Sequence, residues 1–255
     1  MRSWVIFDFD DTLGGVLING QVSFTHQAYT DAIRRFGEAM ALRGHDPDEA
    51  IQEMDRIDRE MCERLGFGDR TRFARSMERA YYNLCVRKSW AVVPEIAKQM
   101  FDIGMSVFTD YPYVPLPGAL EVMDAFRRDY LIAVVTKGNQ QEQMKKIEVT
   151  GVGERADRVI VCDHKDDEDW QYVVSMLAIT REEAARSWAV GNSIKADVNP
   201  PLRLGFNAIH IHDPTGWDFE NDTYETPQEG RRLEVVTSIR EVLNFIPNSV
   251  TTEGR

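Results

Sequence analysis

Three carboxylates and a hydroxyl stand within five residues near the start of the chain, at Asp8, Asp10, Asp11 and Thr12. They directly follow the four apolar residues Trp4–Phe7, a pattern that predicts a buried strand. Like charges this close repel, and a divalent cation is the usual compensator at the end of a buried strand. The alternative is an acidic turn, since Asp is common in turns and caps helices. Because Asp8 and Asp10 share a face of an extended chain, the pattern favours a metal site.

Polar residues also follow three later apolar runs that have the length of buried strands. These groups are Thr136, Lys137, Gly138 and Asn139 after the second run, Asp163, His164, Lys165 and Asp166 after the third, and Gly191, Asn192, Ser193 and Asp197 after the fourth. In an open parallel sheet, ligands bind in the crevice outside the carboxyl ends of the strands. Together the groups offer carboxylates for a cation, helix N-terminal amides for an anion, and one Lys that neutralises charge.

Each group taken singly has a purely structural explanation. Thr136 and Asn139 are suited to capping a helix, and Asn192 is suited to a turn. Lys165 precedes an acidic run, which either competes for its ammonium group or faces water. The coincidence of four complementary groups favours a single site. The residues His164, His210 and His212 are expected to be structural, because none has a paired acid at motif spacing.

The four groups need a parallel sheet to position them, and strand and helix patterns do alternate from residue 118 onward. Strands are expected at 130–135, 158–162, 187–190 and 206–211, and helices at 118–128, 139–149, 168–178 and 195–204. We therefore predict an α/β fold, a Rossmann-like parallel sheet core with helices on both faces. The tail beyond residue 212 carries one expected helix at 239–245, and its composition indicates no function.

The segment from residue 16 to residue 112 has a different pattern. Its apolar residues recur at helical spacing, which predicts a helix at 25–43 and three more that begin near Asp46, Phe73 and Pro94. Gly14, Gly15, Asn19 and Gly20 predict a loop before the first of these helices. We therefore predict a core domain made of residues 1–15 and 113–255, with a helical domain of residues 16–112 inserted after the first strand.

The composition limits the classes of partner. A chain of 255 residues with 43% hydrophobic residues is large enough to bury a substantial core. Its net charge of −12 argues against nucleic acid, although a small anionic substrate remains compatible with a cation in the site. No apolar run approaches the roughly 20 residues of a membrane span, and no signal segment is evident, so a cytoplasmic location is expected. The three Cys residues are too far apart for a zinc or redox pair, and nothing indicates an oligomeric state.

In order and position, the four polar groups resemble the four motifs of the haloacid dehalogenase superfamily. The resemblance covers residues 1 to about 212, and its most specific part is the run Asp8-Phe9-Asp10-Asp11-Thr12-Leu13. One branch of the superfamily carries a helical cap domain between the first and second motifs, where residues 16–112 lie. The resemblance therefore implies a hydrolase with a Rossmann-like core and a helical cap.

The resemblance also implies catalytic roles. Asp8 would be the nucleophile that becomes an aspartyl-phosphate, and Asp10 the acid that protonates the leaving oxygen and then the base that activates water. Lys165 would offset the charge on Asp8 and on the substrate, and Thr136 would hold phosphoryl oxygens. The residues expected to bind the phosphoryl group are Thr136, Lys137, Gly138 and Lys165. A carboxylate can serve as a covalent nucleophile if nearby cations suppress the repulsion between two anions.

The resemblance implies a Mg²⁺ cofactor, held by Asp8, Asp10, Asn192 and Asp197, with Asp10 contributing its backbone carbonyl. Most metal-using relatives begin the fourth motif with Gly-Asp, whereas this chain has Gly191-Asn192. An amide oxygen ligates magnesium but brings no charge, so either Asn192 binds more weakly or Asp197 takes a larger share.

The presence of Asp10 favours a phosphatase over a dehalogenase. The dehalogenase branch of the superfamily lacks an acid at this position, because a halide leaves without a proton. The sequence therefore predicts a magnesium-dependent phosphatase that acts on a small phosphorylated metabolite. Two alternatives stay open. One is a non-catalytic module that binds magnesium or a phosphorylated ligand, which Asn192 favours. The other is a phosphotransferase or mutase that passes the same aspartyl-phosphate to another acceptor.

Overall fold

The chain divides into two compact units in the computed structural model, which describes residues 3–66, 68–216 and 222–247. The first unit comprises Met1–Phe24 and Tyr113–Arg255, and the second comprises Thr25–Pro112. None of the helices in the described residues combines the length and the apolar character that a membrane crossing requires.

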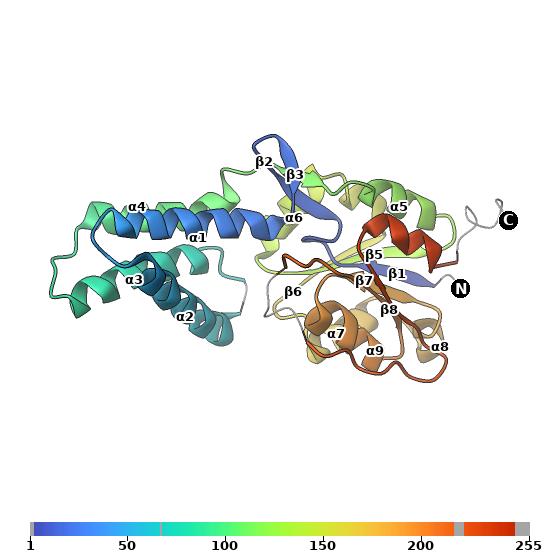
Figure 1. Cartoon of the computed structure of the whole chain (residues 1–255). Helices are drawn as coiled ribbons and strands as arrows, with labels where there is room; N and C mark the ends of the chain where they lie inside the picture. The colour runs from blue at the N-terminus through green and yellow to red at the C-terminus, as the bar shows by residue number, and fades with distance from the viewer. Residues whose placement is uncertain (1–2, 67, 217–221, 248–255) are drawn as a thin grey trace. The chain divides into compact units, whose positions relative to one another are not determined.

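A six-stranded sheet forms the centre of the first unit (Figure 1). Its strands are β1 (Trp4–Phe7), β5 (Leu131–Lys137), β6 (Arg158–Cys162), β7 (Trp188–Gly191), β8 (Asn207–Ile211) and β9 (Leu233–Val236). They run in the order β6-β5-β1-β7-β8-β9, and all neighbouring pairs are parallel. The chain builds outward from β1 on one side and then returns to its other side, so the strand order reverses between β1 and β7. Such a reversal opens the crevice in which α/β sheets bind ligands.

Alternate residues of β1 enter two different cores, one on each face of the sheet. Val5 and Phe7 pack with residues of α5 (Ala119–Phe126) and of the 3₁₀ segment η5 (Ile239–Asn244). Trp4 and Ile6 pack with residues of α7 (Asp167–Met176) and α8 (Arg181–Ala184). In Figure 1, α5 and α7 accordingly cover opposite faces. The predicted α/β fold, a parallel sheet with helices on both faces and a helical insertion, is confirmed.

The expected sheet strands are present as β5, β6, β7 and β8, each with ends within two residues of the prediction. The expected helix at 195–204 is instead a π turn, η3 (Ile194–Val198), followed by the short helix α9 (Asn199–Arg203). Pro200 and Pro201 explain the interruption, because proline lacks the amide hydrogen that would continue the earlier turn. Strand β9 was not predicted, since its four residues alternate only weakly between buried and exposed positions.

The loop predicted at residues 14–20 is wrong for Gly14 and Gly15, whereas Asn19 and Gly20 do form a turn, with φ of 52° and 77°. The segment forms β2 (Gly14–Ile18) and β3 (Gln21–Ser23), which make an antiparallel sheet with β4 (Tyr113–Pro115). A Cβ on Gly14 would lie 2.4 Å from the Phe9 ring, and one on Gly15 would lie 2.4 Å from the Ser23 carbonyl oxygen. Gly14 and Gly15 therefore serve close packing inside a strand rather than a turn. Residues 16–24 accordingly lie in the first unit, although the sequence had grouped them with the helical segment.

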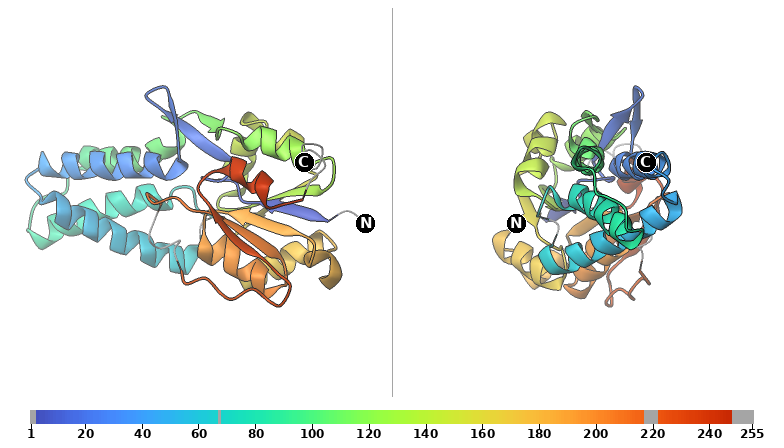
Figure 2. Two further views of the ribbon diagram at one scale, coloured as in Figure 1. Left: turned by 45° about the vertical axis from the view of Figure 1, so that its right-hand side comes forward. Right: turned by 90° about the vertical axis from the view of Figure 1, so that its left-hand side faces the viewer.

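Four α-helices make up most of the described part of the second unit (Figure 2). They are α1 (Thr25–Ala41), α2 (Pro47–Leu65), α3 (Arg72–Arg87) and α4 (Pro94–Met105). The predicted start of α2 is present, since the Asp46 carboxylate accepts hydrogen bonds from the amides of Asp48 and Glu49. The apolar faces enclose a separate core, in which α3 and α4 approach so closely that a Cβ on Gly104 would lie 2.4 Å from Ala74 Cα.

The α6 helix (Gln140–Val149) completes the first unit and begins directly after β5. Asn139 accepts a hydrogen bond from the Glu142 amide at 3.1 Å, so the helix-capping explanation holds for this residue. Ile147 packs into the same core as Val5 and Phe7. The first turn of α6 is therefore fixed at the carboxyl edge of the sheet, beside the end of β1.

Candidate active site

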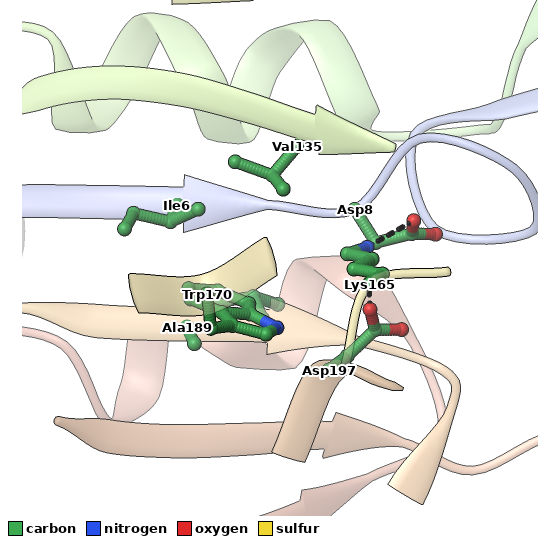
Figure 3. A pocket seen from close by; sticks show the side chains of 8 residues that line it. Ile6, Asp8, Val135, Lys165, Trp170, Ala189 and Asp197 are labelled. Atoms are coloured by element: carbon green, nitrogen blue, oxygen red, sulfur yellow. Dashed lines mark hydrogen bonds and ion pairs between the residues drawn. The ribbon is translucent and has the colours of Figure 1, made fainter. Parts of the chain in front are cut away.

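Lys165 brings the ends of three strands together (Figure 3). Its Nζ lies 2.6 Å from Oδ1 of Asp8, which follows β1, and 2.5 Å from Oδ1 of Asp197, which lies beyond β7. Lys165 itself follows β6, two strands away from β1. These three side chains line a small pocket whose floor is apolar and includes Ile6 and Trp170. Two carboxylates thus share one ammonium group at the carboxyl edge of the sheet.

Burial governs the electrostatics of this trio. Removal from water raises the pKa of Asp8 to about 7, with Lys165 opposing the rise and the charge of Asp197 adding to it. Burial lowers the pKa of Lys165, but the charges of Asp197 and Asp8 outweigh it and raise that pKa above its ordinary value. Lys165 is therefore a permanent cation, whereas the negative charge of Asp8 is only partly compensated. A second cation at this position would stabilise the ionised carboxylate.

The loop that carries Lys165 is shaped by the acidic run that follows it. Lys165 has a left-handed backbone with φ of 62°. The Asp169 carboxylate accepts hydrogen bonds from the backbone amides of His164 at 2.9 Å and of Lys165 at 2.5 Å. Asp166 caps the start of α7 through its side chain. These two acids bind backbone amides, so the ammonium group of Lys165 is left to pair with Asp8.

The turn after β7 holds Asp197 and Asn192. Oδ2 of Asp197 accepts a hydrogen bond from the Ser193 amide at 2.9 Å. A Cβ on Gly191 would lie 2.3 Å from that same oxygen, so only glycine allows the carboxylate to approach the end of β7. Oδ1 of Asn192 accepts a hydrogen bond from the Thr12 hydroxyl at 3.3 Å, which joins this turn to the segment after β1.

His210 supports the same turn from β8. Its Nε2 donates to the Asn192 carbonyl at 2.9 Å, because a carbonyl can only accept, and its Nδ1 accepts from the Tyr224 hydroxyl at 2.7 Å. Burial lowers the pKa of His210, which favours the neutral imidazole. The contacts give His210 a structural role, as the sequence predicted.

The end of β5 carries three of the residues predicted to bind phosphate, and none of them lines the pocket between Asp8 and Asp197. Thr136 is only 1% exposed. Gly138 has a left-handed backbone with φ of 132°, and its amide donates to the Cys162 carbonyl at 3.2 Å. Thr136 and Lys137 are the last two residues of β5, the strand beside β1, and Gly138 follows them.

Asp10 contacts two α6 residues that the sequence reasoning missed. Lys146 Nζ lies 3.0 Å from Oδ1 and 3.1 Å from Oδ2 of Asp10, and Gln143 Nε2 donates to Oδ2 at 2.8 Å. Both α6 side chains are buried although they are polar. Their spacing of three residues, on the same helix face as the apolar Ile147, was the available signal.

The residues expected to bind magnesium offer oxygen atoms as donors. Within the described ranges, no group of three or more His, Cys, Asp or Glu side chains could hold a metal ion by itself. The expected set contains two carboxylates, from Asp8 and Asp197, with the amide oxygen of Asn192 and the backbone carbonyl of Asp10. All four are oxygen donors of the kind that Mg²⁺ takes. The partly compensated charge of Asp8 also favours a cation, so the donor set fits Mg²⁺.

The fold and these contacts define a class of protein: a Rossmann-like α/β chain with a helical insertion and a carboxylate–lysine cluster at the carboxyl edge of its sheet. No family profile and no curated protein sequence matches the chain. Solved structures do match along nearly the whole length. A haloacid dehalogenase-like family hydrolase from Xanthomonas campestris has 20% sequence identity and a TM-score of 0.75, covering 100% of this chain and 95% of that one.

Two further solved structures are similar. YfnB from Bacillus subtilis, described as a HAD-hydrolase and bound to magnesium, has 13% identity and a TM-score of 0.59, covering 96% of this chain and 98% of that one. The L-2-haloacid dehalogenase from Xanthobacter autotrophicus has 16% identity and a TM-score of 0.55, covering 95% of this chain and 97% of that one. The protein therefore has the fold of the haloacid dehalogenase-like hydrolases with a helical insertion, as the motif resemblance implied.

Proposed function

We propose that this protein is a magnesium-dependent phosphatase that hydrolyses a small phosphorylated metabolite through an aspartyl-phosphate. The observation that carries the proposal is the contact of 2.6 Å between the buried Lys165 ammonium and Asp8, two residues before a second, more accessible acid, Asp10. Lysine offsets the repulsion that a carboxylate nucleophile meets as it approaches a phosphate. The second acid supplies the proton that an alkoxide leaving group needs.

In the first step, a carboxylate oxygen of Asp8 attacks phosphorus. A bond forms between this oxygen and phosphorus, and the bond between phosphorus and the leaving oxygen breaks. The protonated carboxyl of Asp10 gives its proton to the leaving oxygen, which departs as an alcohol. Lys165 stays cationic throughout and stabilises the negative charge that Asp8 shares with the phosphoryl group.

In the second step, Asp10 takes a proton from a water molecule, whose oxygen attacks the phosphorus of the aspartyl-phosphate. The bond between Asp8 and phosphorus breaks, so inorganic phosphate leaves and both acids return to their starting states. The Gly138 backbone and the Thr136 hydroxyl, at the end of the neighbouring strand β5, are the groups we assign to the phosphoryl oxygens. This assignment requires the Gly138 amide to exchange its present partner, the Cys162 carbonyl, for the substrate.

Magnesium would be held by Asp8, the carbonyl of Asp10, Asn192 and Asp197. When bound, it supplies positive charge that offsets the phosphoryl oxygens during transfer. The magnesium bound to YfnB, which shares the fold, supports this cofactor. Because Asn192 brings no charge, we expect Asp197 to contribute most of the electrostatic attraction from the fourth strand end.

The helical unit would act as a cap that selects the leaving group and excludes bulk water during transfer. The core domain would carry the catalytic residues, and the inserted helical domain would carry none of them. A screen of phosphorylated metabolites in the presence of magnesium would identify the leaving group.

Dehalogenation is the rival reaction, because a haloacid dehalogenase shares the fold. Asp10 argues against it, since halide leaves without a proton and the reaction has no use for an acid at that position. Chloride release from 2-chloropropionate, compared with phosphate release from aryl phosphates, separates the two reactions. Phosphotransfer is separated by product analysis, because hydrolysis releases free phosphate in step with substrate loss. A module that only binds ligands would bind magnesium without turnover.

The decisive experiment is the Asp8→Asn variant, assayed with p-nitrophenyl phosphate and magnesium. Loss of the nucleophile should lower turnover by at least about 1,000-fold. The exposed Asp163, which precedes Lys165 by two residues, provides a matched control as Asp163→Asn. Comparable turnover by Asp8→Asn and the wild type would exclude an aspartyl-phosphate mechanism.

A further inference from the structure

The contacts of Asp10 are unusual for an acid that must reach a substrate. Both carboxylate oxygens are engaged from the α6 side by nitrogen donors, with Lys146 at 3.0 and 3.1 Å and Gln143 at 2.8 Å. The Asp10 side chain is nevertheless 28% exposed, whereas the Lys146 side chain is only 5% exposed. Asp10 is thus held from one side and accessible from the other.

Gln143 links Asp10 to the end of β5. One Nε2 group donates both to Oδ2 of Asp10 at 2.8 Å and to the Lys137 carbonyl at 2.7 Å. The same side chain packs against Gly138, since a Cβ there would lie 3.0 Å from Gln143 Nε2. The side-chain amide of Gln143 therefore holds both Asp10, the predicted acid, and the Lys137–Gly138 segment, which is predicted to bind the phosphoryl group.

Lys146 is held beneath Asp10 by its own surroundings. Its Nζ lies 5.3 Å from the centroid of the Tyr113 ring, a distance at which a cation interacts with an aromatic face. The Tyr113 hydroxyl donates to Glu142 at 2.8 Å, which fixes the ring against α6. Burying an ammonium group is costly unless a counter-charge is close, so the ion pair with Asp10 restricts both side chains.

We propose that Lys146 and Gln143 are positioning residues for Asp10, which orient its carboxyl toward the leaving oxygen in the first step and toward water in the second. This inference rests on the proposed function. The two residues touch neither substrate nor metal in the proposal. Lys146 acts through Asp10, whereas Gln143 also holds the Lys137 carbonyl. A fixed acid can deliver its proton without first losing rotational freedom, which is the usual advantage of preorganised catalytic groups.

The test uses Lys146→Met, which removes the charge and keeps most of the side-chain length. Lys145 provides a matched control, because it is the neighbouring residue, also faces Tyr113 at 5.7 Å, and has a 54% exposed side chain that pairs with Glu142. Lys145→Met removes the same charge from the same helix without touching Asp10. Lys146→Arg is the conservative variant, which restores a cation.

The informative measurement is kcat/KM for a series of substituted phenyl phosphates, with magnesium present. A poor leaving group such as phenol needs the proton from Asp10, whereas p-nitrophenolate leaves with little help. We expect Lys146→Met to lower kcat/KM for phenyl phosphate by about 10–100-fold and for p-nitrophenyl phosphate by less than about 3-fold. We expect Gln143→Leu to show the same selective loss to a smaller extent, Lys146→Arg to recover most of it, and Lys145→Met to match the wild type.

A second readout separates the two steps. With p-nitrophenyl phosphate, kcat should fall while kcat/KM stays nearly constant, because Asp10 also activates the water that cleaves the aspartyl-phosphate. Equal losses of kcat/KM across the whole series, or the same loss in Lys145→Met, would overturn the positioning role. Absence of phosphatase activity in the wild-type protein would instead overturn the proposed function, so the two failures are distinguishable.

Discussion

Replacing Asp8 by Asn should stabilise the protein while it abolishes activity. Asp8 is buried beside a second carboxylate, and its pKa is raised from 3.8 to about 7, chiefly by burial. A raised pKa means that the unfolded chain releases the Asp8 proton at lower pH than the folded protein does. Raising the pH through this range therefore favours unfolding of the wild type. Asn at position 8 carries no ionisable proton, so the variant lacks this loss of stability.

The size of the effect follows from the two pKa values. The difference between 3.8 and about 7 corresponds to about 4 kcal/mol of stability, which the wild type loses between those two pH values. Between about pH 5.5 and about pH 8, the loss is about 2 kcal/mol. The stability of Asp8→Asn relative to the wild type should rise by this amount over that interval. Lys165 keeps Asp197 as its partner in the variant, so its buried charge stays paired.

The assay is urea unfolding of both proteins at the two pH values, in the presence of a chelator. Tryptophan fluorescence reports mainly on the first unit, because Trp4, Trp170 and Trp188 are buried in its core, whereas Trp90 of the second unit is exposed. Using the change with pH, rather than the absolute stabilities, removes the offset caused by the different hydrogen bonds of Asn and Asp. If magnesium binds the ionised carboxylate as proposed, it should stabilise the wild type more than the variant.

A relative stability that does not change with pH would contradict the raised pKa of Asp8, because it would mean that Lys165 fully compensates the charge of Asp8. A relative stability that falls as the pH rises would refute it more strongly, since it would reverse the sign of the pKa change. The Asp163→Asn variant is the control for a general effect of removing one negative charge. Its side chain is exposed, so this variant removes a charge without the burial that surrounds Asp8.

Three further predictions concern other parts of the chain. Hydrogen bonds from Arg56, together with Asn83 and Arg87, lower the pKa of Glu53 from 4.5 to about 2, so the second unit should lose stability as the pH falls through this window. Because Arg56 and Arg87 are half exposed, screening by solvent reduces this loss of stability to about 1 kcal/mol. Circular dichroism in acid should show the loss in the wild type and not in Glu53→Gln. In Gly191→Ala, the added Cβ would lie 2.3 Å from an Asp197 oxygen, so a magnesium titration of activity should show weaker binding, by about 10-fold or more. In Gly104→Ala, the added Cβ would lie 2.4 Å from Ala74 Cα, and overpacking should lower the free energy of unfolding of the second unit by about 1–3 kcal/mol, measured by urea unfolding.

Local sequence patterns predicted most elements of the first unit because the central strands of its large sheet, β1, β5, β7 and β8, are buried on both faces. Such strands read as short apolar runs, and the helices between them follow their own periodicity. The short sheet of β2, β3 and β4 was missed because its partners are far apart in sequence, with Val16 paired to Tyr113. Its glycines are explained by close contacts with Phe9 and Ser23, which no local pattern reveals.

The chemical groups that follow each strand can be read from the amino-acid sequence, because a strand end is a local feature. Asp8, Lys165 and Asp197 could therefore be assigned to one edge of a parallel sheet before their distances were known. Which of these groups meet depends on how the strands and helices pack. The order of the strands lets Lys165 reach both carboxylates, and burial then raises the pKa of Asp8. The partners of Asp10 on α6 also depend on the packing of a helix against the end of β1, and such contacts join residues more than a hundred positions apart.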